Sequence, residues 1–400
     1  MAGNLAVVRA AAGPGARIYA VVKANAYGHG AVEISRVLES LGIDGLCVAT
    51  WDEALELRAA RVRAPILVLF AVPPSFAREA ADRRISISIG DLGQLAATLA
   101  AFATAGPRRP SLHVHLEVET GLGRNGLRLD HVAAAARQIA RARLVRLDGL
   151  WTHTQNAADP EILGRQVERF EEAVTTLRAD ALLPPIRHAA ASAAMLVDGV
   201  LGYDAVRAGL LLYGLVPDDL ARRAVPEAGQ LRPAMSLHAR PIRVLELPAG
   251  WGISYGPSFV TTRPSRIATL PLGYGDGWPR TTSNRAAALV RGRRVPLVGT
   301  VAMDAVMADV TDVPGPPVTV DDEFVLLGRQ GDESITAADL AASRGTISYE
   351  VVTAMAGRLP RVYHAPSGAH GLRTLASGPA LATLPAPATD PAPRRRTQRS

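Results

Sequence analysis

Lysine is nearly missing from this sequence. Of the 44 lysines and arginines among its 400 residues, only Lys23 is a lysine. A guanidinium stays protonated, so arginine replaces lysine where a charge or a donor is enough, but it does not serve as an amine nucleophile or base. Lys23 is therefore a candidate for amine chemistry, and chance survival of a surface lysine is the alternative that the count alone leaves open.

Cysteine and long apolar runs are scarce as well. Cys47 is the only cysteine, which excludes an internal disulfide and a cysteine-rich metal site and predicts a small buried side chain in a strand. No segment reaches the roughly 18 apolar residues of a membrane span, and the N-terminus lacks the features of a secretory signal. We predict a soluble protein of the reducing cytoplasm that has no metal centre and binds no membrane.

The charge balance is basic, with a formal net charge of +7 at pH 7. Four arginines (Arg394, Arg395, Arg396 and Arg399) lie among the last seven residues, and the others are scattered. A nucleic-acid site gathers its basic residues on one face, so this pattern favours a solvated basic surface and no nucleic-acid partner. The length and the 48% hydrophobic share allow two or three domains with a substantial core.

Short β-rich runs alternate with Ala-rich amphipathic stretches through the first half of the chain, which is the pattern of βα units around a parallel sheet. Eight runs are predicted as strands: 18–23, 45–49, 66–70, 85–89, 112–118, 147–152, 186–191 and 205–210. Six helices are predicted between them: 29–41, 51–61, 75–82, 91–105, 129–142 and 160–181. We therefore predict an α/β fold with a (β/α)8 TIM barrel over residues 1–225.

The texture changes after Pro226 to strand-like runs separated by Gly and Pro turns, which predicts a separate, mainly β domain over residues 226–370. Its expected strands are 235–247, 266–272, 286–290, 305–310 and 324–327, with helices at 337–343 and 349–358. The end of the chain is rich in Ala, Pro, Thr and Arg without periodicity, so residues 371–400 are predicted to be a disordered tail.

Candidate chemical groups follow five of the predicted barrel strands. In a (β/α)8 barrel the carboxyl ends of the strands and the loops after them form the active-site face. The residues at these positions are Lys23, Arg124, His153, Ser192 and Arg207. Taken singly, each is read more simply as a loop arginine, a hydrogen-bonded histidine or a structural side chain. Together they are expected to face one mouth of the barrel.

A long motif around Lys23 points to a known family. The run VVKANAYGHG, residues 21–30, resembles the cofactor-lysine motif of the alanine racemase family. Further motifs follow in the family's order: ETGLGR (119–124), TH (152–153), VRAG (206–209), SYG (254–256), GYGDG (273–277), AMD (302–304) and ISYE (347–350). The resemblance extends over residues 4–365.

The resemblance implies a fold type III enzyme that uses pyridoxal 5'-phosphate to interconvert L-alanine and D-alanine. Lys23 would hold the cofactor as a Schiff base and act as the base on one face of the substrate's Cα, with Tyr255 on the opposite face. Racemisation needs two such groups, because a proton taken from one side must be replaced from the other. Without the motif, Tyr255 is an ordinary packed or interface tyrosine.

The resemblance also assigns the other site residues. Arg207 would donate to the cofactor's pyridine nitrogen, which it leaves unprotonated because of its own high pKa, and His153 would lie beside the ring. Hydroxyls and backbone N–H groups would hold the phosphate: Tyr27, Ser192, Tyr349, Gly209 and Leu210. The implied substrate residues are Arg124, Tyr274 and Met303. In the family, Tyr255, Tyr274 and Met303 reach the barrel mouth of the other subunit, which implies a head-to-tail homodimer.

Two departures from the family pattern matter. Many relatives carry a carbamylated lysine where this chain has Glu117, and the anion steadies the arginine at position 124. Our hypothesis is that Glu117 supplies that charge without modification. The chain also begins close to the family's first helix, so we expect either an upstream start or an open edge in the β domain.

Other functions stay open at the level of sequence. The racemised amino acid is expected to be alanine, with serine or a broader range as alternatives. A decarboxylase of the same fold uses a cysteine near the C-terminus, whereas Cys47 lies in the barrel. A non-catalytic cofactor carrier has the barrel and the lysine but no β domain, and the region after Pro226 in this chain argues against that alternative. Production of D-alanine is the expected role, although the motifs do not distinguish cell-wall supply, D-amino-acid catabolism or a biosynthetic cluster.

Overall fold

The computed structural model describes residues 1–103, 110–197, 203–218, 220, 229–365 and 368–377. The chain forms two compact units, residues 1–356 and residues 357–400. The predicted domain boundary near residue 225 and most of the predicted tail, residues 378–400, lie outside the described residues.

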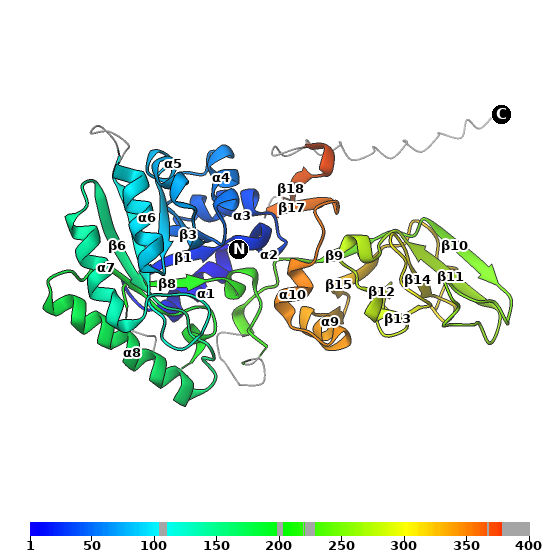
Figure 1. Ribbon diagram of the computed structural model, residues 1–400. Coiled ribbons are helices and arrows are strands. Elements are labelled where there is room, and N and C mark those ends of the chain that lie inside the picture. Colours follow the sequence, from blue (N-terminus) through cyan, green and yellow to red (C-terminus); the bar gives the residue numbers. More distant parts are fainter. Residues whose placement is uncertain (104–109, 198–202, 219, 221–228, 366–367, 378–400) are drawn as a thin grey trace, which may run out of the picture. The chain divides into compact units, whose positions relative to one another are not determined.

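Eight parallel strands form the first sheet, as predicted (Figure 1). They run in the order β7-β6-β5-β4-β3-β2-β1-β8, and a parallel bridge between Ala191 and Arg207 joins the two ends of the sheet into a barrel. The strands are β1 (Arg17–Val21), β2 (Gly45–Val48), β3 (Ile66–Ala71), β4 (Ile85–Ile89), β5 (Leu112–Glu117), β6 (Val145–Trp151), β7 (Ile186–His188) and β8 (Ala205–Ala208).

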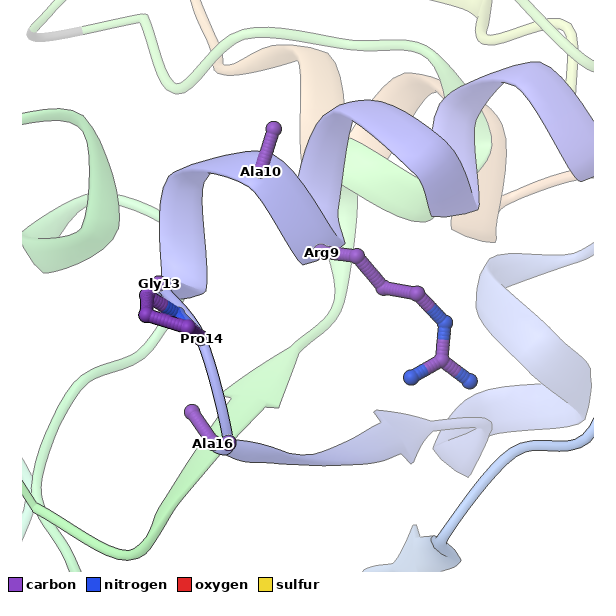
Figure 2. A pocket seen from close by; sticks show the side chains of 6 residues that line it. Arg9, Ala10, Gly13, Pro14 and Ala16 are labelled. Carbon is purple, nitrogen blue, oxygen red and sulfur yellow. The ribbon is translucent and has the colours of Figure 1, made fainter.

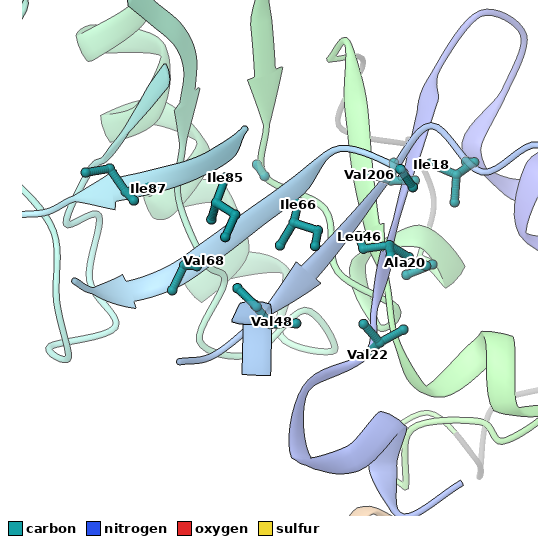
Figure 3. Close-up of a cluster of buried hydrophobic side chains, with 14 of the residues drawn as sticks. Ile18, Ala20, Val22, Leu46, Val48, Ile66, Val68, Ile85, Ile87 and Val206 are labelled. Carbon is teal, nitrogen blue, oxygen red and sulfur yellow. The ribbon is translucent and has the colours of Figure 1, made fainter. Parts of the chain in front are cut away.

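Successive strand residues divide between two cores because side chains alternate across a strand. Ile18 and Ala20 of β1 belong to the large core between the sheet and its helices, together with residues of β2, β3, β4 and β8 (Figure 3). Tyr19 and Val21 belong to a smaller cluster with Cys47, which confirms that the only cysteine is a buried strand residue. The second cluster fills the inside of the barrel, below its mouth.

Helices cover the outer face of the barrel (Figure 1). They are α1 (Ala2–Ala12), α3 (Ala31–Ser40), α4 (Trp51–Ala59), α5 (Ala77–Asp82), α6 (Leu92–Ala103), α7 (Leu129–Arg141) and α8 (Pro160–Ala179). The short element α2 (Lys23–Tyr27) lies instead at the mouth of the barrel, directly after β1. The six predicted helices correspond to α3–α8. Five are somewhat shorter than predicted, and the predicted end of the helix that matches α6, at residue 105, lies outside the described residues. Helix α1 was not among the predicted ones, and the side chain of its Asn4 donates to the carbonyls of Leu212 and Arg232.

The later strands form an antiparallel sheet in the order β10-β11-β14-β13-β12-β15-β16, with β9 paired to β15. Their bounds are β9 (Leu237–Ala239), β10 (Arg243–Leu247), β11 (Ser265–Leu270), β12 (Ala287–Val290), β13 (Arg293–Val298), β14 (Val306–Asp309), β15 (Phe324–Gln330) and β16 (Glu333–Ile335). Two helices follow, α9 (Ala337–Arg344) and α10 (Ser348–Thr353). The predicted combination of an α/β barrel and a mainly β domain is therefore confirmed.

Several element predictions were wrong in detail. Strand β13 was missed because its sequence RRVPLV places arginines and a proline among the apolar residues, and β16 is only three residues long. Leu210 lies in the short 3-10 helix η3 (Leu210–Tyr213) rather than in the last barrel strand. The second late helix ends at Thr353 instead of continuing to residue 358.

The second unit contains the hairpin β17 (Arg361–Ala365) and β18 (Gly368–Arg373), followed by the 3-10 turn η7 (Leu375–Ser377). Residues 371–377 of the predicted tail thus have regular structure. Within the described part of the chain, no helix is both long and apolar enough to cross a bilayer. The cytoplasmic location stays a prediction.

Candidate active site

A cavity of ≈ 570 Å³ opens at the carboxyl ends of the barrel strands. This size is typical of a small-molecule site. Nine of the predicted site residues line it: Lys23, Tyr27, Arg124, His153, Ser192, Arg207, Gly209, Leu210 and Tyr349. The five residues expected at strand ends lie in one cavity, and Tyr349, from much later in the chain, joins them there.

Lys23 begins a backbone turn of unusual hand. The four residues that follow it, 24–27, all have positive φ, between 51° and 54°, although none of them is glycine. A left-handed conformation costs an ordinary residue roughly 1–2 kcal/mol, so this turn needs support from outside. Asn25 accepts from the backbone N–H of Ala31 (2.8 Å), and the N–H of Ala24 donates to the carboxylate of Glu53 (2.6 Å).

The turn is followed by Gly28, whose φ is +80°. A Cβ atom at this position would lie 2.1 Å from the carbonyl oxygen of Val352. Helix α10 therefore packs directly on the backbone of the Lys23 turn, and only glycine leaves room for it. This contact also brings Tyr349 to the cavity.

The Lys23 amine lies in surroundings that lower its pKa. Burial is the largest cause, and Arg124 and, more weakly, Arg207 add repulsion, while Glu53 and Cys47 act in the opposite direction. A lowered pKa increases the share of free amine near neutral pH, which is the form that reacts with a carbonyl and accepts a proton.

Arg207 is a cation buried under the mouth of the barrel, with only 2% of its surface exposed. Its guanidinium donates to the backbone carbonyls of Thr152 (2.7 Å), His188 (2.8 Å) and Ala189 (3.1 Å). It also lies over the indole of Trp151, 4.8 Å from the ring centroid. Burial lowers the pKa of Arg207 to about 10, so it remains a cation at neutral pH.

Two buried histidines continue from Arg207 into the barrel. Because a guanidinium only donates, Nδ1 of His188 accepts from Arg207 (2.9 Å), and its proton lies on Nε2, 2.9 Å from Nδ1 of His115. Burial lowers the pKa of His115 to about 4 and that of His188 well below its usual value. A Cβ at Gly149 would lie 2.1 Å from His115, so a glycine in β6 provides the space for this ring.

His153 is held neutral in the same way. Burial, with repulsion from Arg207 and Arg124, lowers its pKa to about 3. Arg207 lies 3.3 Å from Nδ1 of His153, which therefore accepts. A neutral imidazole at the cavity wall can face a bound ring without adding charge.

Hydroxyl groups gather at one end of the cavity. The N–H of Gly209 donates to Oγ of Ser192 (2.9 Å), and a Cβ at Gly209 would meet the Tyr27 hydroxyl at 2.7 Å. The rings of Tyr27 and Tyr349 lie 6.1 Å apart. Uncharged donors grouped in this way can hold a phosphate dianion.

Arg124 lies at the other side of the cavity, near an acid. Its guanidinium is 3.8 Å from Glu117, whose side chain is 2% exposed, and 5.5 Å from the centroid of the Phe70 ring. Asn125 donates to the second oxygen of Glu117 (2.5 Å). Burial raises the pKa of Glu117, and its bond from Asn125 and the nearby Arg124 oppose that change.

Three predicted site residues lie elsewhere. Tyr255, Tyr274 and Met303 do not line the cavity that holds Lys23 in the described structure, and they are 71%, 43% and 53% exposed. Tyr255 follows Ser254, which has a φ of 65° and donates to the carbonyl of Thr300 (2.6 Å). The loop thus presents the Tyr255 ring outward from the β sheet.

Sequence reasoning missed other residues of the site. Trp151 is the last residue of β6 and Phe70 the last but one of β3, and both line the cavity. An aromatic residue near the carboxyl end of a barrel strand is a signal that could have identified them. Asp218 also lines it and accepts from the backbone and hydroxyl of Ser348 (3.0 and 2.7 Å), which ties α10 to the barrel. No sequence pattern indicates that contact across 130 residues.

A second hollow of ≈ 370 Å³ lies beside the turn between α1 and β1 (Figure 2). It is lined by Arg9, Ala10 and residues 13–16. Arg9 donates to the carbonyl of Gly42 (2.7 Å). The hollow is near the amino end of β1, opposite the Lys23 end, and offers no group for catalysis.

Two family models together match almost the whole described chain. The model "Alanine racemase, N-terminal domain" matches residues 1–217, and "Alanine racemase, C-terminal domain" matches residues 234–363. An alanine racemase of Symbiobacterium thermophilum is 43% identical over 352 residues, which cover 87% of this chain and 90% of that protein. One of Halothermothrix orenii is 37% identical over 363 residues, 90% of this chain and 93% of that protein.

Solved structures agree. The alanine racemase of Bacillus anthracis with bound L-Ala-P superimposes with a TM-score of 0.85 at 32% identity and covers 93% of this chain and 95% of its own. The enzyme of D-cycloserine-producing Streptomyces lavendulae gives a TM-score of 0.82 at 35% identity, with 90% and 93% covered.

Proposed function

This chain belongs to the alanine racemase family, and we propose that it interconverts L-alanine and D-alanine with Lys23 and Tyr255 as the two groups that move the proton. The matches over nearly the full length make it an alanine racemase, an isomerase of a family that generally uses pyridoxal phosphate. The observation that carries the residue assignment is that the only lysine of the chain lies in the barrel-mouth cavity, next to Arg207 and His153.

The residues present fit pyridoxal 5'-phosphate. The cavity has one amine with a lowered pKa, a group of hydroxyls at one end and a buried guanidinium in its lining. We propose that Lys23 holds the cofactor covalently and that Tyr27, Ser192 and Tyr349, with the N–H groups of Gly209 and Leu210, hold its phosphate. Pyridoxal phosphate, when bound, supplies the electron withdrawal that makes the substrate's Cα–H acidic.

Lys23 and Tyr255 then divide the proton transfers. The free Lys23 amine takes or returns the proton at Nζ on one face of Cα, and the phenolic oxygen of Tyr255 does so on the other. The two groups exchange the roles of acid and base between the two reaction directions.

Arg207 and His153 are proposed to face the cofactor ring. The guanidinium of Arg207 is a poor proton source and a good hydrogen-bond donor, so it would donate to the pyridine nitrogen without protonating it. Three backbone carbonyls and His188 hold the guanidinium in place. A weak electron sink of this kind favours return of the proton to Cα over side reactions.

Arg124 is proposed to bind the substrate carboxylate, a task suited to a forked cation. Glu117, 3.8 Å away, is proposed to hold this guanidinium in place. The charge that a carbamylated lysine supplies in many relatives would then come from an unmodified carboxylate.

The second catalytic group is proposed to come from a second copy of the chain. Tyr255, Tyr274 and Met303 are exposed and do not line their own chain's cavity in the described structure. A head-to-tail homodimer would place all three over the Lys23 cavity of the partner and complete the substrate site. One chain alone would have only one base.

Racemisation of L-amino acids, measured together with the visible absorbance of the protein, tests the assignment. We expect activity with L-alanine, visible cofactor absorbance in the wild type, loss of both in Lys23→Ala, and loss of activity alone in Tyr255→Phe. Wild-type protein without cofactor absorbance would refute the cofactor assignment. A panel that includes L-serine defines the substrate range.

Mixing two inactive variants tests the shared site. When Lys23→Ala and Tyr255→Phe chains are unfolded together and reassembled, about half of the dimers are mixed, and each has one intact site. We expect recovery of about a quarter of wild-type activity from that statistical mixture. No recovery would mean that both groups act within one chain.

A further inference from the structure

Glu53 lies just outside the proposed catalytic set, at the first turn of α4. One oxygen of its carboxylate accepts from the N–H of Ala24 (2.6 Å), the residue directly after Lys23. The other oxygen accepts from the N–H groups of Ala49 (2.7 Å) and Thr50 (3.1 Å) at the end of β2. A single carboxylate thus joins the loops that follow the first two barrel strands.

The position of this carboxylate matters because of the turn that it supports. Residues 24–27 are all left-handed, so the chain after Lys23 has a strong tendency to relax to ordinary φ values. Ala24 is the first of them and directly follows Lys23. If its N–H lost the bond to Glu53, the backbone next to Lys23 could relax. Charge-assisted bonds from N–H groups to a carboxylate are short and strong, which suits this role.

Helix capping alone does not explain the arrangement. Glu53 completes a capping box with Thr50 at the start of α4. In a capping box, the side chain at the position of Glu53 needs only one bond, from the backbone N–H of the N-cap residue, here Thr50. The two shorter bonds, to Ala24 and Ala49, lie outside α4 and fix the loop that carries Lys23.

We propose that Glu53 is a positioning residue that clamps the left-handed turn after Lys23 and thereby fixes where the Lys23 amine enters the cavity. The proposal goes beyond the proposed racemase function but rests on it for the importance of Lys23. The carboxylate also interacts with the Lys23 amine through its charge. The other titratable groups that interact with this amine are Arg124 from the loop after β5, Cys47 of β2, Arg207 of β8 and His153 after β6. Among these groups, Glu53 makes the largest contribution that raises the pKa of Lys23, against the lowering by burial and by the two arginines.

The test compares Glu53→Gln and Glu53→Asp with Asp52→Asn as the matched control. Glutamine keeps the length but loses the charge and one acceptor oxygen. Aspartate keeps the charge but is one methylene too short to reach Ala24 from α4. Asp52 is an exposed acid in the same turn of the same helix. Steady-state kinetics of the full-length dimer with bound cofactor give kcat and KM for L-alanine.

We expect kcat to fall on the order of 10-fold or more in both Glu53 variants, because misplacing a reacting group by a fraction of an ångström costs rate rather than binding. KM should change by less than about two-fold, and Asp52→Asn should match the wild type within about two-fold in both constants. Wild-type kcat in Glu53→Asp together with a loss in Glu53→Gln would show that only the charge matters, and would overturn the clamp.

A second measurement is independent of racemase activity. Because Lys23 is the only lysine, reductive methylation with formaldehyde of the full-length chain, after removal of the cofactor with hydroxylamine, reports on this amine alone when its peptide is followed by mass spectrometry. The N-terminal amine serves as the internal reference.

The pH at half-maximal labelling rate should move lower in Glu53→Gln and stay close to the wild-type value in Asp52→Asn. An unchanged labelling profile in Glu53→Gln would overturn the electrostatic part of the proposal. If the wild type proved inactive as a racemase, this labelling result would still show whether the Glu53 carboxylate acts on the Lys23 amine.

Discussion

Gly28→Ala is the substitution that tests most directly how the barrel and α10 build one site. Gly28 has a φ of +80°, and the added Cβ would lie 2.1 Å from the carbonyl oxygen and 3.1 Å from the carbonyl carbon of Val352. The left-handed conformation costs alanine roughly 1–2 kcal/mol, and forced repacking against backbone costs about 1–3 kcal/mol more. The free energy of unfolding should fall by roughly 2–5 kcal/mol in total.

The clash also moves a functional group. Backbone oxygen cannot rotate away as a flexible side chain can, so α10 must shift, and Tyr349 shifts with it away from Tyr27. We expect the dissociation constant for pyridoxal phosphate to rise about 10-fold, which corresponds to the loss of about one hydrogen bond of 1.4 kcal/mol. Urea denaturation and a fluorescence titration with the cofactor measure the two effects.

Gly42→Ala is the matched control. Gly42 has a φ of +71°, and nothing lies within 4 Å of the position of its Cβ, so this variant carries the conformational cost without the clash. Its unfolding free energy should fall by roughly 1–2 kcal/mol, and its cofactor affinity should not change. Equal losses of stability in the two variants, with equal cofactor affinity, would refute the packing of α10 on the Lys23 turn.

Two further predictions concern buried titratable groups. Glu117→Gln removes the anion 3.8 Å from Arg124, and we expect kcat/KM for L-alanine to fall roughly 3- to 10-fold, in line with the loss of a partly buried ion pair; wild-type turnover would contradict the role of Glu117. Burial lowers the pKa of His115 to about 4, below the usual value of 6.5. As the pH falls below 6.5, this histidine therefore binds a proton in the unfolded chain but not in the folded one. The unfolding free energy should therefore decrease between pH 6.5 and 4, by up to about 1.4 kcal/mol per pH unit for this one histidine, and His115→Gln should reduce that slope in pH-dependent urea denaturation. Identical slopes in the two proteins would rule out the shift.

The sequence determined the architecture of the barrel and the centre of the site. Strand and helix periodicity is a short-range property, so the eight parallel strands and six of the surrounding helices could be predicted from runs of a few residues. The carboxyl ends of those strands meet at one face, which is why Lys23, Arg124, His153, Ser192 and Arg207 could be expected in one cavity. Sequence also identified Lys23 through composition, because an amine cannot be replaced by a guanidinium.

Tertiary structure alone decided how these residues are held. The residue types at positions 24–27 do not predict a left-handed turn, since alanine and tyrosine avoid it. The hydrogen bond that Ala24 donates to Glu53, the one that Asn25 accepts from Ala31, and the packing of α10 impose it. The line from Arg207 through His188 to His115 joins residues that are far apart in the chain. Such contacts depend on which surfaces pack together once the sheet has closed. The periodicity of short segments does not depend on these contacts, so it cannot predict them.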